Sequence, residues 1–243
     1  MSYHLETIPL WEAMEADFPC PLCSLNEKCE QNEVERSLGG SVMEPDTRIR
    51  VNQHGICAHH HQLLFEMKNR LGHALLVDSH TKEVLKKLDG FDTLLPAEGK
   101  KGLFARDKGS LNALEQAIRG LSRDCVICAE MQDHMERYLY TFLHLWKTDA
   151  SFRQKWEASR GVCLPHAADL LACAQKHLSG KEQRAFAQSL LKQIKANLSQ
   201  DEKDLEWFTL KFDYRNQDKP WGNSRNALER AINRLRGRCI SGD

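Results

Sequence analysis

Apolar residues recur every three to four positions along almost the whole chain, which is the period of an α-helix. One stripe over residues 60–75 predicts a single long helix, and further stripes cover residues 131–146, 170–178 and 186–208. The period-two alternation of a half-buried strand is nearly absent, and Arg48 to Asn52 is the only weak candidate. The pattern therefore predicts an all-α fold.

The helices fall into two similar runs. Short amphipathic segments at residues 8–18 and 111–121 lead each run, with Thr7 and Ser110 as the predicted N-caps. Each run then reads as a Cys-x2-Cys knuckle, a helix, a short return helix, a Cys-x2-His motif and another helix. We predict tandem duplicated modules at residues 1–88 and 110–180. A linker at 89–109 joins them, because it mixes Gly, Pro and charge, and C-terminal helices with an aromatic and basic tail occupy 181–243.

Cysteine and histidine positions repeat with nearly the same spacing in both modules. Each copy reads C-x2-C, a long insert, then G-[IV]-C-x2-H, and the interval from the second to the third cysteine is 34 positions in one copy and 35 in the other. The cysteines are Cys20, Cys23 and Cys57 in the first copy and Cys125, Cys128 and Cys163 in the second. Duplication of a metal-binding module is the simplest explanation of this repeat.

Three thiolates and an imidazole form a complete tetrahedral ligand set for Zn²⁺. Among the histidines that follow Cys57, only His60, and not His59 or His61, matches the interval from Cys163 to His166. We therefore predict two sites, each inside one module and each at helix N-termini, where the helix dipole favours thiolate. The ligand sets are Cys20, Cys23, Cys57 and His60, and Cys125, Cys128, Cys163 and His166. Because the copies are alike, the sequence leaves open an exchange of the Cys-x2-His pairs between modules.

Zinc is favoured over an iron–sulfur cluster, the alternative cofactor, because such clusters normally take four cysteines. Two zinc ions per chain are expected. Four protein ligands leave no open position for water, so both sites are predicted to be structural. Cys29, Cys173 and Cys239 have no counterpart in the other copy and are expected to be packed or free thiols. Disulfides are not expected, because the cysteine count is odd and no signal peptide is evident.

Composition narrows the function classes. The chain has 243 residues, with 34 basic and 34 acidic side chains and a formal net charge of zero. This balance does not indicate a nucleic-acid binder, and we interpret the five arginines between Arg225 and Arg238 as a solvated basic helix face. No apolar run is long enough to span a membrane. A reducing cytoplasm suits thiolate ligands, so a cytoplasmic protein is expected.

The segment from Trp207 to Arg215, followed by Pro220 to Gly222, interleaves aromatic and charged residues. One interpretation is a pocket wall in which Lys211 and Arg215 face an anion and an aromatic ring stacks on a planar group. The other, which we favour, is a strap whose aromatic side chains anchor it across the helices. The ligand-binding residues under the pocket interpretation are Lys211, Asp213, Tyr214, Arg215 and Trp221.

Together, CPLC, GICAHH, CVIC, GVCLPH and FDYRNQDKPWG resemble an uncharacterised family of bacterial cytoplasmic proteins, classed as a domain of unknown function, over essentially the whole chain. The resemblance implies a helical metal-binding protein and supplies no activity. We expect a non-enzymatic adaptor, interaction or regulatory module with a protein partner and no catalytic residues. The alternatives are a redox or iron–sulfur protein, and an enzyme or small-ligand binder that uses the aromatic tail.

Overall fold

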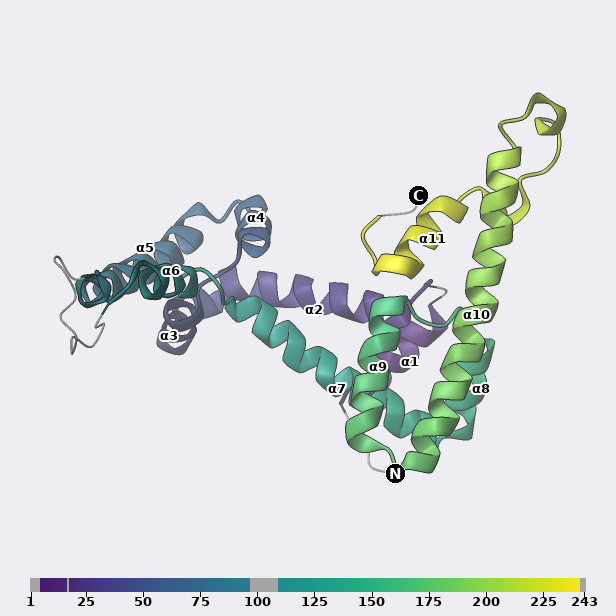
Figure 1. The fold of residues 1–243 in the computed structure, drawn as a ribbon, viewed down its shortest axis with the longest axis horizontal. Coiled ribbons are helices and arrows are strands. Elements are labelled where there is room, and N and C mark those ends of the chain that lie inside the picture. The colour runs from purple at the N-terminus through teal and green to yellow at the C-terminus, as the bar shows by residue number, and fades with distance from the viewer. Residues whose placement is uncertain (1–4, 17, 97–108, 241–243) are drawn as a thin grey trace, which may run out of the picture. The chain divides into compact units, whose positions relative to one another are not determined.

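The computed structural model describes residues 5–16, 18–96 and 109–240 (Figure 1), and within them every regular element is helical. This confirms the predicted all-α fold class. The α-helices are α1 (Thr7–Glu15), α2 (Pro21–Leu38), α3 (Pro45–His54), α4 (Ala58–Glu66), α5 (Arg70–Asp89), α6 (Leu111–Gly120), α7 (Val126–Thr148), α8 (Ala150–Ala158), α9 (Leu164–His177), α10 (Gly180–Leu210) and α11 (Ala227–Arg236). Short 3₁₀ turns are η1 (Gly40–Met43), η2 (Phe91–Leu94), η3 (Tyr214–Asn216) and η4 (Gly222–Ser224).

The chain divides into two compact units that cut across the two sequence modules. Unit 1 contains Met1–Lys28 and Asp133–Asp243, and unit 2 contains Cys29–Gln132. Both boundaries fall inside helices, α2 and α7, and neither lies in the predicted linker at 89–109. Residues 97–108 of that linker lie outside the described residues. Each unit therefore combines segments from both copies of the repeat.

The core of unit 1 is built on aromatic side chains from α7, α8 and α10. Phe142 is fully buried, and its ring makes edge-to-face contacts with Phe152, Trp156 and Phe186 at centroid distances of 5.1, 5.0 and 6.5 Å. Such pairs add about 0.5–1.5 kcal/mol each beyond their buried area. Asp149 caps α8 by accepting hydrogen bonds from the backbone N–H groups of Ser151 and Phe152. The cap fixes where α8 begins and so orients two of these rings.

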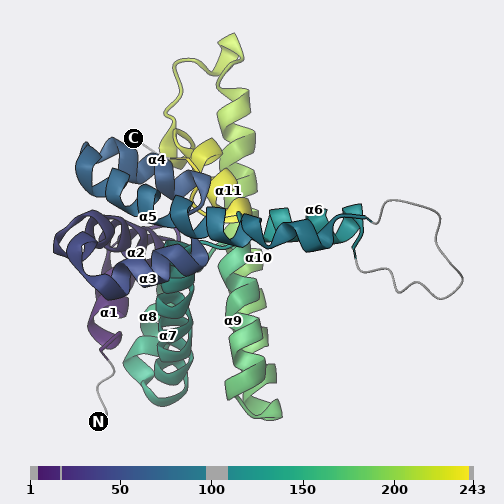
Figure 2. The same cartoon turned by 90° about the vertical axis from the view of Figure 1, so that its left-hand side faces the viewer.

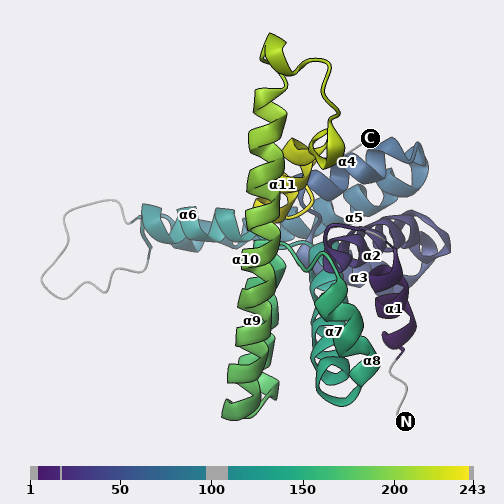
Figure 3. The same cartoon turned by 90° about the vertical axis from the view of Figure 1, so that its right-hand side faces the viewer.

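The long helix α10 is the support for the C-terminal part of unit 1. A capping box between Ser179 and Glu182 starts the helix, as the amphipathic pattern of residues 181–211 predicts. Helix α9 packs beside its first half (Figure 1), and α11 packs against its second half (Figure 3). This arrangement brings α11 beside the segment that leads into α9.

Unit 2 has a smaller aliphatic core. Helix α3 packs against α5, with α4 beside α5 (Figure 2). The buried members of this core are Val34, Leu38, Val42, Val51, Leu64, Leu76, Cys125, Val126 and Ile127. Because Cys125 belongs to this core, the start of α7 is fixed within unit 2.

The single long helix predicted over residues 60–75 is wrong, because the chain breaks between α4 and α5. Lys68 has a φ of 64°, in the left-handed region that a helix interior excludes. Asn69 then caps α5 by accepting a hydrogen bond from the N–H of Gly72, and it donates to the carbonyl of Leu38. Leu71 lies just beyond the break and is 73 % exposed.

Three local predictions have mixed outcomes. Ser110 is the N-cap of α6, as predicted, and accepts from the N–H of Ala113. Thr7 is the first residue of α1, and Glu6 occupies the cap position without a side-chain hydrogen bond. Arg48 to Asn52, the weak strand candidate, lies inside α3.

No helix in the described part of the chain has both the length and the apolarity needed to cross a bilayer.

Replacing Phe142 with Ala tests the aromatic core. We expect the free energy of unfolding to fall by about 3–5 kcal/mol, because the substitution leaves a cavity among three rings. Phe212→Ala is the control at an exposed ring and should cost no more than about 1 kcal/mol. Urea unfolding followed by circular dichroism measures both, and similar losses for the two variants would contradict this assignment of the core.

Candidate metal centre

The first group of metal-binding side chains joins the starts of α2 and α9 within unit 1. Cys20 directly precedes α2 and Cys23 lies in its first turn, while Cys163 is the N-cap of α9 and His166 lies in its first turn. Three of the four side chains are buried, and His166 is partly buried. All four ligand atoms lie within 4.8 Å of one another.

The second group repeats this arrangement within unit 2 at the starts of α4 and α7. Cys57 is the N-cap of α4, with His60 in the first turn, and Cys125 precedes α7, with Cys128 in its first turn. This group is more open than the first, because Cys128 is exposed and Cys57 is partly exposed. The location of the ligand residues at helix N-termini is as predicted from the sequence.

The structure pairs the motifs differently from the prediction. Cys20 and Cys23 lie beside Cys163 and His166, not beside Cys57 and His60, and the second Cys-x2-Cys pair takes the histidine motif of the first copy. The two copies thus exchange their Cys-x2-His pairs. The spacing within the sequence is the same for either pairing, so the choice is made only by the packing of the helices.

The distances within both groups fit one tetrahedral ion. With Zn–S near 2.3 Å and Zn–N near 2.0–2.1 Å, a tetrahedron has S···S edges of about 3.8 Å and S···N edges of about 3.6 Å. The Sγ atoms of Cys20 and Cys23 lie 3.8 and 3.6 Å from that of Cys163, and the Sγ atoms of Cys57 and Cys128 are 3.9 Å apart. The S···N distances to Nδ1 of His60 and His166 are 3.2–3.5 Å. These Cys/His groups could therefore each hold a metal ion.

Without a cation, each group ionises only in part. Hydrogen bonds with the thiols of Cys163 and Cys20 hold the pKa of Cys23 well below its usual value, and the other thiols then ionise less readily. Burial, followed by the neighbouring Cys125, raises the pKa of Cys128 to about 12. Burial and the thiol of Cys163 likewise raise the pKa of Cys20 well above its usual value. Burial lowers the pKa of His166, but the hydrogen bonds with Cys163 and Cys23 outweigh it and raise the pKa to about 10. A divalent cation would take the place of these protons and let the thiolates share one site.

Two glycines provide the tight entry into the histidine-bearing helices. Gly55 and Gly161 have φ values of 71° and 73°, which favour glycine over any residue with a side chain. A Cβ on Gly161 would lie 2.9 Å from Nδ2 of Asn197 on α10. In unit 2, the carbonyl of Gly55 accepts from the N–H of Val126 at 3.0 Å, which joins the two helix starts of the second group directly.

The histidines next to His60 have other partners. Nδ1 of His60 faces the thiols, and its Nε2 lies 3.3 Å from a carboxylate oxygen of Glu30. The same oxygen is 2.8 Å from Nε2 of His59. His61 instead contacts His73, with Nδ1 and Nε2 2.8 Å apart. Glu30 therefore lies within ion-pair distance of the His60 ring without a hydrogen bond to it, and a small rotation would give the carboxylate contact common at metal-bound histidines.

The remaining cysteines stand apart from both groups. No disulfide joins any pair of cysteines in the described part of the chain. Cys29 is buried, Cys173 packs partly buried against the core of unit 1, and Cys239 is exposed. Their predicted roles as packed or free thiols match this burial.

The aromatic tail folds on itself around one buried ammonium group. Nζ of Lys211, on a side chain only 5 % exposed, donates to the carbonyls of Asn216, Gln217 and Lys219 at 2.6–2.7 Å. The indole of Trp207 donates to the carbonyl of Pro220 at 3.1 Å. Lys211 therefore holds its own loop and does not face an anion.

The other predicted ligand-binding residues of the tail also contact the loop itself. The ring of Trp221 lies 5.2 Å from Nζ of Lys211 and 5.8 Å from the ring of Phe208. Asp213 pairs with Arg215, and Tyr214 is 78 % exposed. The ion pair of Asp213 with Arg215 fits the strap interpretation, but the aromatic rings do not anchor the segment across other helices: they pack within the tail, and Phe212 is 73 % exposed.

Of the five arginines predicted to form a solvated face, Arg225, Arg236 and Arg238 are exposed, and the other two are not. Arg234 is 4 % exposed, and its Nε pairs with Asp201 of α10. Arg230 pairs with both Asp201 and Asp204. The sequence carries a signal for these pairs that our sequence analysis missed. Asp201 and Asp204 are three positions apart and so share a face of α10, and Arg230 and Arg234 are four positions apart and share a face of α11.

The model of one protein family matches residues 1–242, and its description is "Family of unknown function (DUF6062)". The chain belongs to this family. The predicted resemblance to a family of unknown function is thus confirmed. No curated protein and no solved structure matched the chain. Membership in DUF6062 supplies no activity, so the function must be argued from the geometry.

Paired substitutions test the exchange of motifs in this DUF6062 protein. Cys20→Ser with Cys163→Ser damages one group, so elemental analysis should find one metal ion fewer per chain. Cys20→Ser with Cys57→Ser damages both groups, and both ions should be lost after dialysis against a weak chelator. Loss of both ions in the first double variant and of one ion in the second would show instead that each group forms within one module.

Single substitutions around His60 test its assignment as a ligand. His60→Ala should remove metal from the second group, while His59→Ala should not, because His59 contacts Glu30 and no thiol. Glu30→Gln should weaken metal binding by about 10- to 100-fold, the usual cost of losing a partner of a metal-bound histidine. Competition with a zinc-binding dye measures all three. Loss of the ion in His59→Ala alone would show that the wrong histidine was chosen.

Proposed function

We propose that the protein binds two zinc ions, one in each Cys3His group, and that both ions are structural. The observation that carries this proposal is the agreement of the S···S distances of 3.6–3.9 Å with the edges of a zinc tetrahedron, alongside S···N distances of 3.2–3.5 Å that are slightly shorter than its edges. Soft thiolates with an imidazole select zinc among the abundant divalent metals.

The size of each group favours a single ion over an iron–sulfur cluster. A polynuclear cluster spreads its cysteine ligands over several iron atoms and needs a wider cage. Here all ligand atoms of a group lie within 4.8 Å of one another. The donor set also includes a histidine in each group, which is unusual for such clusters.

A structural role is supported by what each group joins. The thiols of Cys23 and Cys163 are 140 positions apart in the sequence, and His60 is 65 positions from Cys125. Four protein ligands leave no position for a reacting water. Each ion would therefore fix two helix starts that are distant in the chain. Structural zinc sites contribute on the order of 10–16 kcal/mol to folding.

We further infer that the stapled helices form a non-enzymatic scaffold for a protein partner. The support is a set of exposed apolar side chains around the break between α4 and α5: Phe65, Met67 and Leu71 are 56, 39 and 73 % exposed. Apolar side chains gathered at a surface commonly mark an interaction site.

Arg230 and Arg234 are engaged with aspartates, which speaks against α11 as a nucleic-acid surface. Nine cysteines used as thiols suit a reducing cytoplasm.

A redox role is the second candidate, and the exposure of Cys128 favours it. Hydrogen peroxide would take two electrons from the thiolates of Cys57 and Cys128, whose Sγ atoms are 3.9 Å apart. The thiolates would form a disulfide, and peroxide with two protons would become two waters. Zinc would leave the second group. Zinc release at low peroxide doses from the wild-type chain, together with a Cys57–Cys128 disulfide found by mass spectrometry, would favour this candidate.

Elemental analysis with melting curves tests the structural role. We expect two zinc ions per chain in protein purified without chelator. Cys125→Ser should lower the melting temperature strongly, because it removes a ligand that joins α4 and α7, whereas Cys239→Ser, at an exposed thiol outside both groups, should change it little. A brown sample rich in iron and sulfide would contradict the zinc assignment. A Cys125→Ser protein with wild-type melting would contradict the structural role.

A further inference from the structure

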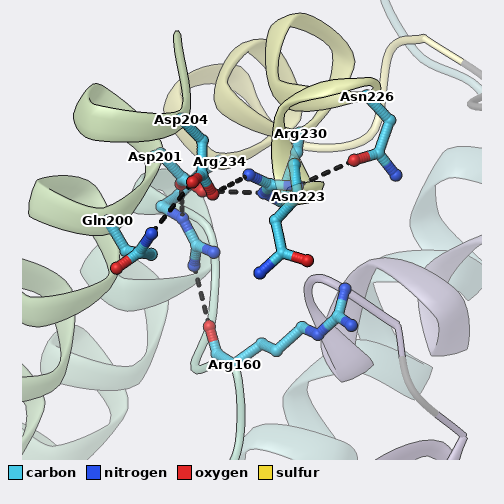
Figure 4. Close-up of polar contacts among 8 residues, drawn as sticks. All are labelled: Arg160, Gln200, Asp201, Asp204, Asn223, Asn226, Arg230 and Arg234. Carbon is cyan, nitrogen blue, oxygen red and sulfur yellow. Dashed lines mark hydrogen bonds and ion pairs between the residues drawn. The ribbon is translucent and has the colours of Figure 1, made fainter. Parts of the chain in front are cut away.

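Two adjoining polar cavities lie within unit 1, between α10, α11 and the segment before α9 (Figure 4). Their volumes are about 220 and about 660 Å³. They share five lining residues: Arg160, Asn226, Glu229, Arg230 and Arg234. The smaller cavity also reaches Cys20 and Cys23 of the first metal group. Polar side chains from three distant parts of the chain therefore converge on one space.

Two of the arginines in this space, Arg230 and Arg234, are held by ion pairs. Asp201, only 3 % exposed, accepts from Nε of both Arg230 and Arg234. Arg230 also donates to Asp204 and to the side chain of Asn226. Charge-assisted bonds of this kind fix the plane of a guanidinium group. These side chains would thus meet a ligand without first having to be ordered.

One guanidinium group retains unused donors. Arg234 uses Nε for Asp201 and Nη1 for the carbonyl of Arg160, at 2.8 Å. Its Nη2 has no acceptor among the residues that the structure describes. An arginine that lines a cavity with free donors suits an oxyanion, either carboxylate or phosphate.

One carboxylate in the same space retains unused acceptors. Oε2 of Glu229 is buried and has no hydrogen-bond partner in the described part of the chain. Glu229 lines both cavities. A buried acceptor without a partner costs about 1–3 kcal/mol, and more when charged. Rotation of this carboxylate toward the cavity would let a donor on a bound molecule remove that cost.

The overall charge of the space favours an anionic group. Five arginines line the two cavities: Arg160, Arg225, Arg230, Arg234 and Arg238. Three carboxylates oppose them: Asp201, Asp204 and Glu229. Two of those carboxylates are already engaged by arginine, which leaves Glu229 as the acceptor for a ligand.

We propose that this space is a binding site for a small molecule that carries both an oxyanion and an amino group, of about the size of an amino acid. The oxyanion contacts Arg234, and the amino group donates to Glu229. The site is distinct from both metal groups, although it borders the first. It is also distinct from the aromatic tail, where the sequence had suggested a pocket.

Calorimetric titration of the zinc-loaded full-length chain tests the proposal with matched probes. Glycine and O-phosphoethanolamine carry both groups, whereas acetate and methyl phosphate lack the amino group. We expect glycine to bind roughly tenfold or more tightly than acetate, or O-phosphoethanolamine roughly tenfold or more tightly than methyl phosphate, which is the usual gain from one charged hydrogen bond. Tighter binding of glycine and acetate would identify the oxyanion as a carboxylate, and tighter binding of O-phosphoethanolamine and methyl phosphate would identify it as a phosphate.

Variants locate the binding. Glu229→Gln should abolish the preference for the amino group, and Arg234→Lys should weaken binding of every probe. Arg236→Gln is the matched control, because Arg236 is an exposed arginine of α11 that lines neither cavity. Because Arg234 is buried in an ion pair, a melting curve checks that Arg234→Lys still folds. If Arg234→Lys does not fold, the binding measured with Glu229→Gln decides the proposal.

Two results would overturn the proposal. Failure of all four probes to bind at millimolar concentration would remove the site, and unchanged binding in Glu229→Gln and Arg234→Lys would place it elsewhere. Zinc content is measured on the same samples. A chain with two zinc ions and no probe binding contradicts only this proposal, and probe binding by a chain without zinc contradicts only the proposed zinc function.

Discussion

The repulsion among closely packed thiols is the constraint on which the rest of this structure depends. Three cysteines and a histidine meet in each group with their ligand atoms within 4.8 Å. Such a group ionises only in part without a cation: the neighbouring thiols lower the pKa of Cys23, whereas burial and the neighbouring Cys125 raise the pKa of Cys128 to about 12. A divalent cation would favour the ionised form of all three thiols. The attraction of each thiolate to the cation would exceed its repulsion by the neighbouring thiolates. The positive ends of two helices add to that attraction.

The exchange of motifs between the two copies determines which helices each ligand group joins. Each group takes its cysteine pair from one copy of the repeat and its histidine motif from the other. Neither copy by itself contains a complete group in this arrangement. Helices whose starts are distant in the chain are thereby tied together, and the closure of such long loops is entropically costly without a strong bond. A metal ion at each junction would offset that cost.

Much of this fold and of its metal groups could be predicted from the sequence, for local reasons. Helical periodicity and the position of Cys57 and Cys163 before helices depend on neighbouring residues only. The pairing of motifs depends on which helices pack together, and equal spacing in both copies hides it. The break at Lys68 depends on Asn69 bonding to Leu38, a contact between distant segments. The ion pairs of Arg230 and Arg234 likewise appear only when α11 lies on α10.

The first metal group and the arginine cavity share a short segment of backbone. Arg234 donates to the carbonyl of Arg160, and Cys163 follows three residues later, after the tight turn at Gly161. The segment is therefore held at one end by an ion pair network and at the other by the thiol group. Loss of the cation would release Cys163, and the carbonyl that orients Arg234 would lose its fixed position. Because both sites restrict the same residues, a metal ion in the first group would lower the entropic cost of ordering Arg234 for the proposed ligand. Any such coupling would be reciprocal, so the ligand would strengthen metal binding by the same factor.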